Sequence, residues 1–137
     1  MYIFESDLCR SLYANYNGST TLLDNIEVLG FSPDEYFFAN HTINPDNEGF
    51  CTPRGNCLKA GLLNLTNCVG GVPLVMSCPH FLFSPQDLVD DVVGLKPNLT
   101  QHQTRIYIEP LTGIPLKANK RLQFNTQLLK DPRIRFG

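Results

Sequence analysis

Residues 47–68, NEGFCTPRGNCLKAGLLNLTNC, contain three of the chain's five cysteines, Cys51, Cys57 and Cys68. Pro53 and Gly55 lie between the first two, and such turn residues bring two Cβ atoms to disulfide-bonding distance. A zinc site normally uses two close pairs of ligands, and no second tight pair follows here. The CxxC motif of redox proteins is missing as well. The stretch therefore favours a disulfide-stapled loop, zinc stays the weaker alternative, and one of the five cysteines is left unpaired.

Sequons give an independent indication of the compartment. Four asparagines stand in N-x-S/T motifs without proline and are predicted to be N-glycosylated: Asn17, Asn40, Asn64 and Asn98. Disulfides and N-glycans both belong to oxidising, secretory environments. The two signals together predict a lumenal or extracellular domain.

The bulk composition is that of one globular domain. The chain has 137 residues, 42% of them hydrophobic, and a formal charge of −2 made of 11 basic and 13 acidic side chains that are scattered along it. No charge field strong enough to attract nucleic acid or an anionic membrane is expected, so nucleic-acid binding is excluded. No stretch approaches the roughly 18 apolar residues of a membrane helix, and the N-terminus does not read as a signal peptide. This conflicts with the secretory signals above.

Three short helices are expected from their start signals. Ser84, Pro85 and Asp87 supply an N-cap, a first-turn proline and a first-turn acid for a helix over residues 85–93. The stretch SPDEYFF repeats the signal at Ser32 and Pro33, and a shorter candidate covers residues 7–13.

The rest of the chain reads mainly as strand. Ile106 and Ile108 alternate with polar neighbours, as do the apolar residues within 122–128, and PLTGIP between these runs predicts a hairpin or a β-corner. VPLVMSC and NIEVLGF are two further strand candidates. With ten prolines and ten glycines breaking the chain into short pieces, the expected fold class is mainly β, antiparallel, with several short helices and disulfide-stapled loops.

No catalytic constellation is recognisable. His41, His80 and His102 are isolated in the sequence, and nucleophile elbows, zinc-protease pairs and phosphate loops are missing. Cys78 and His80 are two residues apart on a predicted strand, which places them on one side by geometry alone. We therefore expect no enzyme activity, no catalytic residues, no cofactor and no metal.

Several blocks carry a family resemblance. They are SDLCRSLY, FFANHT, NPDNEGFC, GNCLKAGLLNLTNC, GGVPLVMSCPHFL, VVGLKPN and IEPLTGIPLKANKRLQFN, and they cover nearly the whole chain. In this order and approximate spacing they resemble the class B scavenger receptor family. The single cysteine after Gly49 and Phe50, and its five-residue gap to Cys57, are most similar to the lysosomal membrane branch of that family.

The resemblance implies an ectodomain tethered by a membrane span at each end, with an antiparallel β-barrel core crossed by an apolar lipid tunnel. It implies the disulfides Cys9–Cys68 and Cys51–Cys57, which leaves Cys78 as the odd, buried thiol. It also marks Tyr107 as a departure, because the family usually has aspartate there.

The resemblance further implies that residues 1–137 are one partial domain, the second half of the ectodomain, without either span. The helical apex through which the lysosomal branch captures lysosomal glucosidase would lie upstream of Met1. The expected location is the lumenal side of lysosomal or endosomal membranes, with the extracellular side of the plasma membrane as the alternative.

The leading functional hypothesis is a lipid-binding and lipid-transporting receptor for cholesterol, phospholipid or fatty acid. Leu122, Phe124 and Leu128 are predicted to face inward from one strand and to line part of the tunnel. The alternative is a cell-surface scavenger or adhesion receptor for lipoproteins or fatty acids that acts through its outer surface. In the intact protein, lysosomal glucosidase is a further expected partner.

Overall fold

The structure is a computed structural model that describes residues 1–128, 132 and 133. It contains nine short strands, three 3-10 helices and two short α-helices in these residues. The strands are β1 Tyr2–Glu5, β2 Arg10–Tyr13, β3 Asn15–Leu22, β4 Ile26–Ser32, β5 Leu62–Asn64, β6 Leu74–Ser77, β7 Arg105–Ile108, β8 Pro115–Asn119 and β9 Gln123–Thr126. The helices are η1 Ser6–Leu8, η2 Pro45–Phe50, η3 Pro79–Phe81, α1 Gln86–Asp90 and α2 Leu99–His102.

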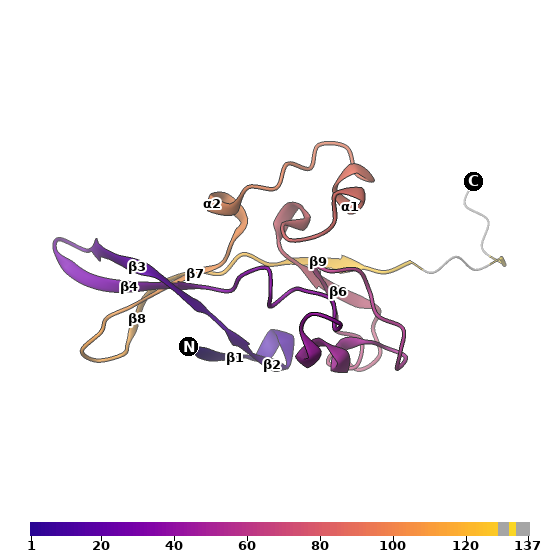
Figure 1. Ribbon diagram of the computed structural model, residues 1–137, viewed down its shortest axis with the longest axis horizontal. Helices are drawn as coiled ribbons and strands as arrows, with labels where there is room; N and C mark the ends of the chain where they lie inside the picture. Colours follow the sequence, from indigo (N-terminus) through magenta and orange to yellow (C-terminus); the bar gives the residue numbers. More distant parts are fainter. Residues whose placement is uncertain (129–131, 134–137) are drawn as a thin grey trace.

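The strands form three antiparallel sheets. β1 pairs with β2, the order β3-β4-β7-β8 makes a four-stranded sheet, and the order β5-β6-β9 makes a three-stranded sheet. Figure 1 shows the four-stranded sheet at one end of the molecule and β6 and β9 at the other, with α2 on one side of the sheet and β1 and β2 on the other. The predicted mainly β class with short helices is confirmed, and the described strands do not close into a barrel.

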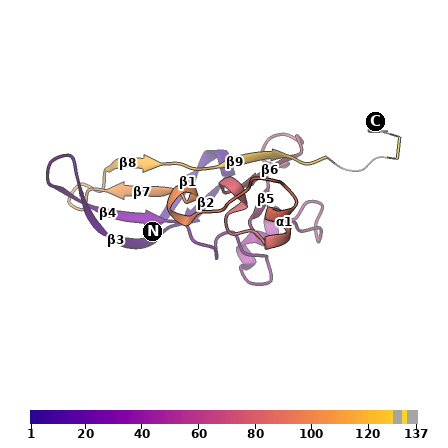
Figure 2. The same ribbon diagram turned by 90° about the horizontal axis from the view of Figure 1, so that it is seen from above.

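The four-stranded sheet has two chemically different faces. Directly opposed residues of antiparallel strands lie on the same face, and the register pairs Phe31 with Ile106 and Ile106 with Ala118. These three residues make one face apolar. The other face holds Gly30, which pairs with Tyr107 in β7. Figure 2 shows the four strands side by side in the order of their pairing.

The core lies between the three-stranded sheet and the β1–β2 hairpin. Its buried members are all apolar or cysteine and come from strands and loops alike: Leu8, Leu12, Ala14, Phe37, Phe38, Leu63, Leu65, Met76, Cys78 and Leu82. Phe37 and Phe38 pack edge to face, with ring centroids 4.8 Å apart. Because no single element here is long enough to bury a face alone, the core depends on contacts between distant parts of the chain.

Two disulfides join these parts. The long-range disulfide, Cys9–Cys68, links the end of η1 to the loop after β5 across 59 residues of sequence. The short disulfide, Cys51–Cys57, closes the loop that follows η2. The pairing is the one that the resemblance implies. Cys78 is free and buried.

One close backbone approach fixes the loop before α1. Gly61 has a φ of +85° and donates its backbone N–H to the Phe38 carbonyl at 2.8 Å. A Cβ on Gly61 would lie 2.0 Å from Ser84 Oγ and 2.8 Å from Ser84 Cα. Only glycine fits this position, both for its backbone conformation and for the space left by Ser84.

The predicted helices are only partly correct. The helix predicted over 85–93 is shorter, Gln86–Asp90, and its N-cap is Pro85 rather than Ser84, with no side-chain cap. SPDEYFF does not form a helix: Ser32 ends β4, and Asp34 accepts from the backbone N–H groups of Tyr36 and Phe37 in a turn. The candidate over 7–13 is also wrong, because a 3-10 turn is followed there by β2. Side-chain capping of a turn competes with a helix start, and the sequence signal is similar for both.

The hairpin prediction was right about the turn and wrong about the partner. The turn after β7 leads into β8, which pairs back on β7. β9 crosses to the other sheet and pairs with β6 instead. VPLVMSC and NIEVLGF are confirmed as β6 and β4. In the described part of the chain, no helix has the length and apolar character needed to cross a membrane.

Candidate functional site

An apolar pocket of about 110 Å³ lies between the β1–β2 hairpin and the apolar face of the four-stranded sheet. The hairpin contributes the directly opposed pair Ile3 and Leu12, and the sheet contributes Ile106 and Ala118. Met76 closes the pocket from the core and is fully buried. The remaining lining residues are Glu5, Leu8, Pro33, Phe37, Phe38, Thr104, Lys120 and Leu122. The arrangement offers apolar surface to an alkyl or ring segment of a ligand.

Charged groups mark the rim of this pocket. Lys120 Nζ donates to Asp7 Oδ2 at 2.6 Å and lies 2.9 Å from Glu5 Oε1. The hydrogen bond to Asp7, followed by that to Glu5, raises the pKa of Lys120. All three side chains reach solvent, so the pairs contribute at most about 1 kcal/mol to stability. Their position ties the segment after β8 to the start of the chain.

The three predicted tunnel residues separate in the structure. Leu122 is half-buried, packs against the core and lines the apolar pocket. Phe124 in β9 is 49% exposed, is paired with Met76 of β6, and lies in a different, open hollow beside the long-range disulfide. Leu128 follows β9 and is 77% exposed. The structure therefore brings only Leu122 to the pocket, and the tunnel role of all three stays a prediction.

The sequon asparagines differ in exposure. Asn17 and Asn98 are exposed, Asn40 is half-buried, and Asn64 is 8% exposed. Asn40, Asn64 and Asn98 each accept a backbone N–H through Oδ1, from Thr42, Thr66 and Gln101 respectively. Asn17 instead donates from Nδ2 to Ser32 Oγ.

These contacts are compatible with modification. A glycan joins the amide nitrogen, which leaves Oδ1 free to keep its hydrogen bonds and leaves one N–H on the nitrogen. Asn98 has the further role of N-cap of α2. The glycan sites themselves stay predictions.

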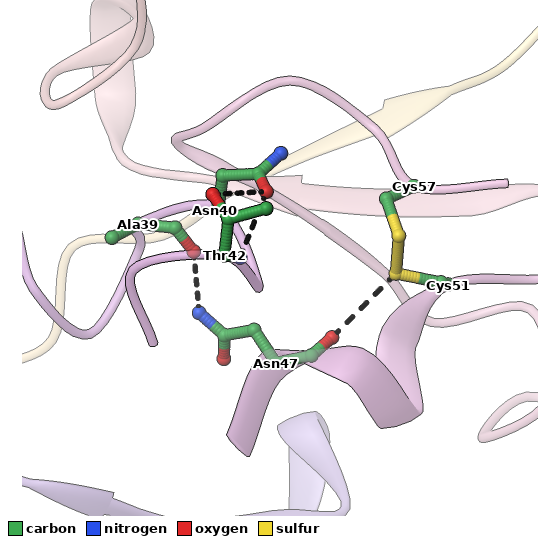
Figure 3. Close-up of a disulfide and its surroundings, with 6 residues drawn as sticks. All are labelled: Ala39, Asn40, Thr42, Asn47, Cys51 and Cys57. Atoms are coloured by element: carbon green, nitrogen blue, oxygen red, sulfur yellow. Dashed lines mark hydrogen bonds between the residues drawn. A yellow bond between two sulfur atoms is a disulfide. The ribbon is translucent and has the colours of Figure 1, made fainter. Parts of the chain in front are cut away.

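The short disulfide is held against a buried asparagine. Asn47 donates from Nδ2 to the Phe37 carbonyl at 2.9 Å. The same nitrogen donates to the Ala39 carbonyl at 2.7 Å, and Cys51 Sγ lies 3.9 Å from the Asn47 carbonyl oxygen (Figure 3). Arg10 donates to Asn47 Oδ1 at 2.6 Å. Its guanidinium lies over the rings of Phe37 and Phe50 at 4.7 and 4.6 Å, and burial lowers its pKa.

One cluster has a metal-like composition. Ligand atoms of His41, Cys51 and Cys57 lie within 4.8 Å of one another. The two sulfurs are joined in the short disulfide, so neither is available as a thiolate ligand. Burial raises the pKa of the free Cys78 thiol to about 12, which makes it a structural side chain rather than a nucleophile.

Sequence reasoning missed a histidine pair. His80 and His102 are 22 positions apart, yet their rings stack with centroids 4.2 Å apart. Each Nδ1 accepts a backbone N–H, from Lys96 at 3.0 Å and from Asn98 at 2.9 Å. Desolvation, His80 and Arg121, in that order, lower the pKa of His102. Only tertiary contacts bring the two rings together, so spacing held no signal for them.

Comparison with known proteins matches these features to one family. The model of the CD36 family matches residues 1–136. Over 130 residues the chain is 38% identical to lysosome membrane protein 2 of Rattus norvegicus, and this alignment covers 95% of the chain and 26% of that protein. It is 39% identical over 140 residues to sensory neuron membrane protein 2 of Manduca sexta (98% and 27%), and 35% identical over 122 residues to scavenger receptor class B member 1 of Mus musculus (89% and 23%).

The chain spans about a quarter of the length of these relatives. They are named as membrane proteins and as a receptor, so the membrane localisation implied by the resemblance is confirmed at the level of the family. The match extends over both disulfides, the apolar pocket and all the strands. The family resemblance read from the sequence is thereby confirmed, and the chain belongs to the CD36 family.

Proposed function

We propose that this chain forms part of the lumenal or extracellular ectodomain of a lipid receptor, and that its apolar pocket contributes to the lipid path. The observation that supports this proposal is the pocket between hairpin and sheet, whose walls are almost entirely apolar. Membership of the CD36 family supports lipids as the ligand class.

The size of the pocket limits what it holds by itself. Its volume of about 110 Å³ is well below the roughly 300–1,000 Å³ of sites that enclose a drug-sized ligand. It accommodates a short alkyl or ring segment, and the rest of a sterol, phospholipid or fatty acid would contact other parts of the protein. Cholesterol, phospholipid and fatty acid therefore all stay within the proposed ligand class.

The test is binding of a fluorescent sterol and a fluorescent fatty acid to the full-length protein. Leu122→Trp fills the pocket and is expected to weaken binding at least fivefold. Leu111→Trp introduces the same ring at an exposed position outside the pocket and is the matched control, with binding expected within twofold of the wild type. Phe124→Trp reports whether the hollow beside the long-range disulfide also takes part. Unchanged binding by Leu122→Trp, with the fold intact, would contradict the proposal.

The lysosomal assignment and the glucosidase role are finer proposals. They are supported by similarity to lysosome membrane protein 2 at 38% identity. We expect the full-length protein to reside in acidic organelles and to retain lysosomal glucosidase in a pull-down. The 137-residue chain alone is expected not to retain it, because the contact implied by the resemblance lies outside these residues. Strong retention by the chain alone would refute that placement.

N-glycosylation is proposed at all four sequons. Peptide mapping after enzymatic glycan release, in which modified asparagines become aspartates, is the measurement. We expect conversion at the exposed Asn17 and Asn98 and also at Asn40 and Asn64, whose Oδ1 contacts survive modification. Unmodified asparagines at all four positions in secreted protein would remove the glycan proposal.

A further inference from the structure

A second hollow lies on the opposite face of the four-stranded sheet from the apolar pocket. Its volume is about 480 Å³, and it is bordered by β3, β4, β7 and α2. Its polar walls include Asn17, Ser19, Thr20 and Gln103, and Tyr107 and Phe31 are its aromatic members. Phe31 and Leu99 add apolar surface, so the walls offer hydrogen-bonding groups and apolar patches side by side.

Paired glycines leave this part of the sheet without side chains. Gly18 in β3 is directly opposite Gly30 in β4, and Gly30 in turn opposes Tyr107 in β7. A Cβ on Gly30 would lie 3.5 Å from the Tyr107 ring and 3.4 Å from the Gly18 carbonyl oxygen. The Tyr107 ring therefore lies beside the backbone of Gly30, where no side chain covers the sheet.

Arg105 is the charged group of the hollow. It lies two residues before Tyr107 on β7, which places both side chains on the same face of the sheet. The residue is half-buried, and its Nε atom is buried without a hydrogen-bond partner. Among the residues that the structure describes, none forms a hydrogen bond or salt bridge with the Arg105 side chain. A buried, unsatisfied donor on a charged group is rare and calls for an explanation.

The charge of the hollow is uncompensated. None of the described residues that line it is a carboxylate. Glu109 follows on the same segment, but its oxygens accept from the backbone of Leu111 and from Thr112. The hollow therefore combines one unpaired guanidinium with a ring and several neutral hydrogen-bonding groups.

We propose that this hollow binds a carboxylate-bearing, hydroxyl-rich ligand with the chemistry of an acidic sugar, and that Arg105 is its anchor. The planar guanidinium matches a carboxylate in bidentate geometry. The hydroxyls of Ser19 and Thr20 offer donors and acceptors to sugar hydroxyls, and the Tyr107 ring offers a face to the sugar carbons. A volume of about 480 Å³ falls within the roughly 300–1,000 Å³ typical of small-molecule sites.

The test separates the two parts of this chemistry. Glucuronate, glucose and acetate are titrated by calorimetry into the full-length protein at low salt, because glucose lacks the carboxylate, and acetate lacks the hydroxyls and is not a lipid. Since Asn17 is a sequon in the wall, the protein is made in an oxidising host compartment that adds no N-glycans. We expect glucuronate to bind at least tenfold more tightly than either comparison compound. Equal affinity for acetate or for glucose would overturn the ligand class.

Variants test the anchor. Arg105→Gln is expected to lower glucuronate affinity at least tenfold. Arg105→Lys is expected to lower it less, because lysine keeps the positive charge but cannot bind a carboxylate in bidentate geometry. Arg54→Gln removes the same charge from an exposed loop and is expected to bind within twofold of the wild type. Unchanged affinity in Arg105→Gln would refute the assignment.

A measurement on the wild type needs no variant to fold. The Arg105 Nε–H resonance is expected to shift on addition of glucuronate and not on addition of glucose, and an unmoved resonance would overturn the proposal. Methyl β-glucuronide, which mimics a terminal residue of a glycan, then distinguishes the source. Binding of the glycoside supports a glycan-borne acid, whereas binding of glucuronate alone supports a free sugar acid. This proposal is independent of the lipid pocket, which lies on the other face of the sheet.

Discussion

The close approach of Gly61 to Ser84 gives a prediction whose size follows from the structure. Gly61→Ala introduces a Cβ that would lie 2.0 Å from Ser84 Oγ, 2.8 Å from Ser84 Cβ and 2.8 Å from Ser84 Cα. A shift of the Ser84 hydroxyl relieves only the first of these contacts, because the Cα belongs to the backbone. The loop before α1 must therefore move.

Two costs add at this position. The left-handed backbone, with φ at +85°, costs an alanine about 1–2 kcal/mol. Forcing a methyl group into a closely packed contact costs about 1–3 kcal/mol. We expect a total loss of about 2–5 kcal/mol in the free energy of unfolding, a large share of the roughly 5–15 kcal/mol of a typical domain.

The assay is urea unfolding with both disulfides intact, and two other glycines separate the two costs. Gly113 has a φ of +71°, and a Cβ added there would meet nothing within 4 Å, so Gly113→Ala reports the backbone cost alone. Gly49 has ordinary φ and open space, so Gly49→Ala is expected to be near neutral. If Gly61→Ala is no more destabilising than Gly113→Ala, the close-approach argument is wrong.

The other predictions concern the disulfides, the free thiol and acid pH. Replacing both cysteines of the long-range disulfide with alanine is expected to lower the free energy of unfolding by about 4 kcal/mol, and the same change in the short disulfide by about 2 kcal/mol. The reason is that the two disulfides close loops of 59 and 6 residues, and the longer loop restricts the unfolded chain more. Equal losses of stability in urea unfolding would contradict this. Cys78, with its pKa raised to about 12, is expected to resist a thiol reagent at pH 8 in the folded chain and to react once unfolded, whereas labelling of the native chain would show that it is accessible. The pKa of His102 is lower in the folded chain than its usual 6.5. The neutral ring therefore contributes to the stability of the fold above pH 6.5, and this stability is lost as the pH falls through the pKa of the folded state. His102→Gln is therefore expected to lose less of its urea midpoint than the wild type between pH 7.5 and pH 5, and equal losses would refute the role of the ring.

Local sequence patterns predicted some elements well. The alternation around Ile106 and Ile108 and the apolar run in VPLVMSC are properties of single segments, and both form strands. Where two structures share one local signal, the sequence was ambiguous. The residues around Asp34 are the same whether its side chain caps a helix or a turn. In the structure Asp34 caps a turn, and Phe37 and Phe38 after it pack into the core.

The candidate sites were less accessible to sequence reasoning. Leu122, Phe124 and Leu128 alternate as one face, but burial depends on what covers each residue, and only Leu122 reaches the apolar pocket. His80 lies in η3 and His102 lies in α2, and the two rings stack only because the fold brings these two short helices together. Non-local contacts of this kind leave no periodicity to detect.

The family and the mainly β class were predictable without coordinates, because cysteine positions, turn residues and alternating patterns are local properties of the chain. Coordinates were needed to establish that β9 pairs with β6 rather than β7, and that Leu122 lies at the apolar face of the four-stranded sheet whereas Arg105 lies at the opposite face. Strand pairing and the environment of a side chain depend on which distant segments cover it. Which segments pair depends on the free energy of packing the whole core, and no single stretch of sequence carries that information.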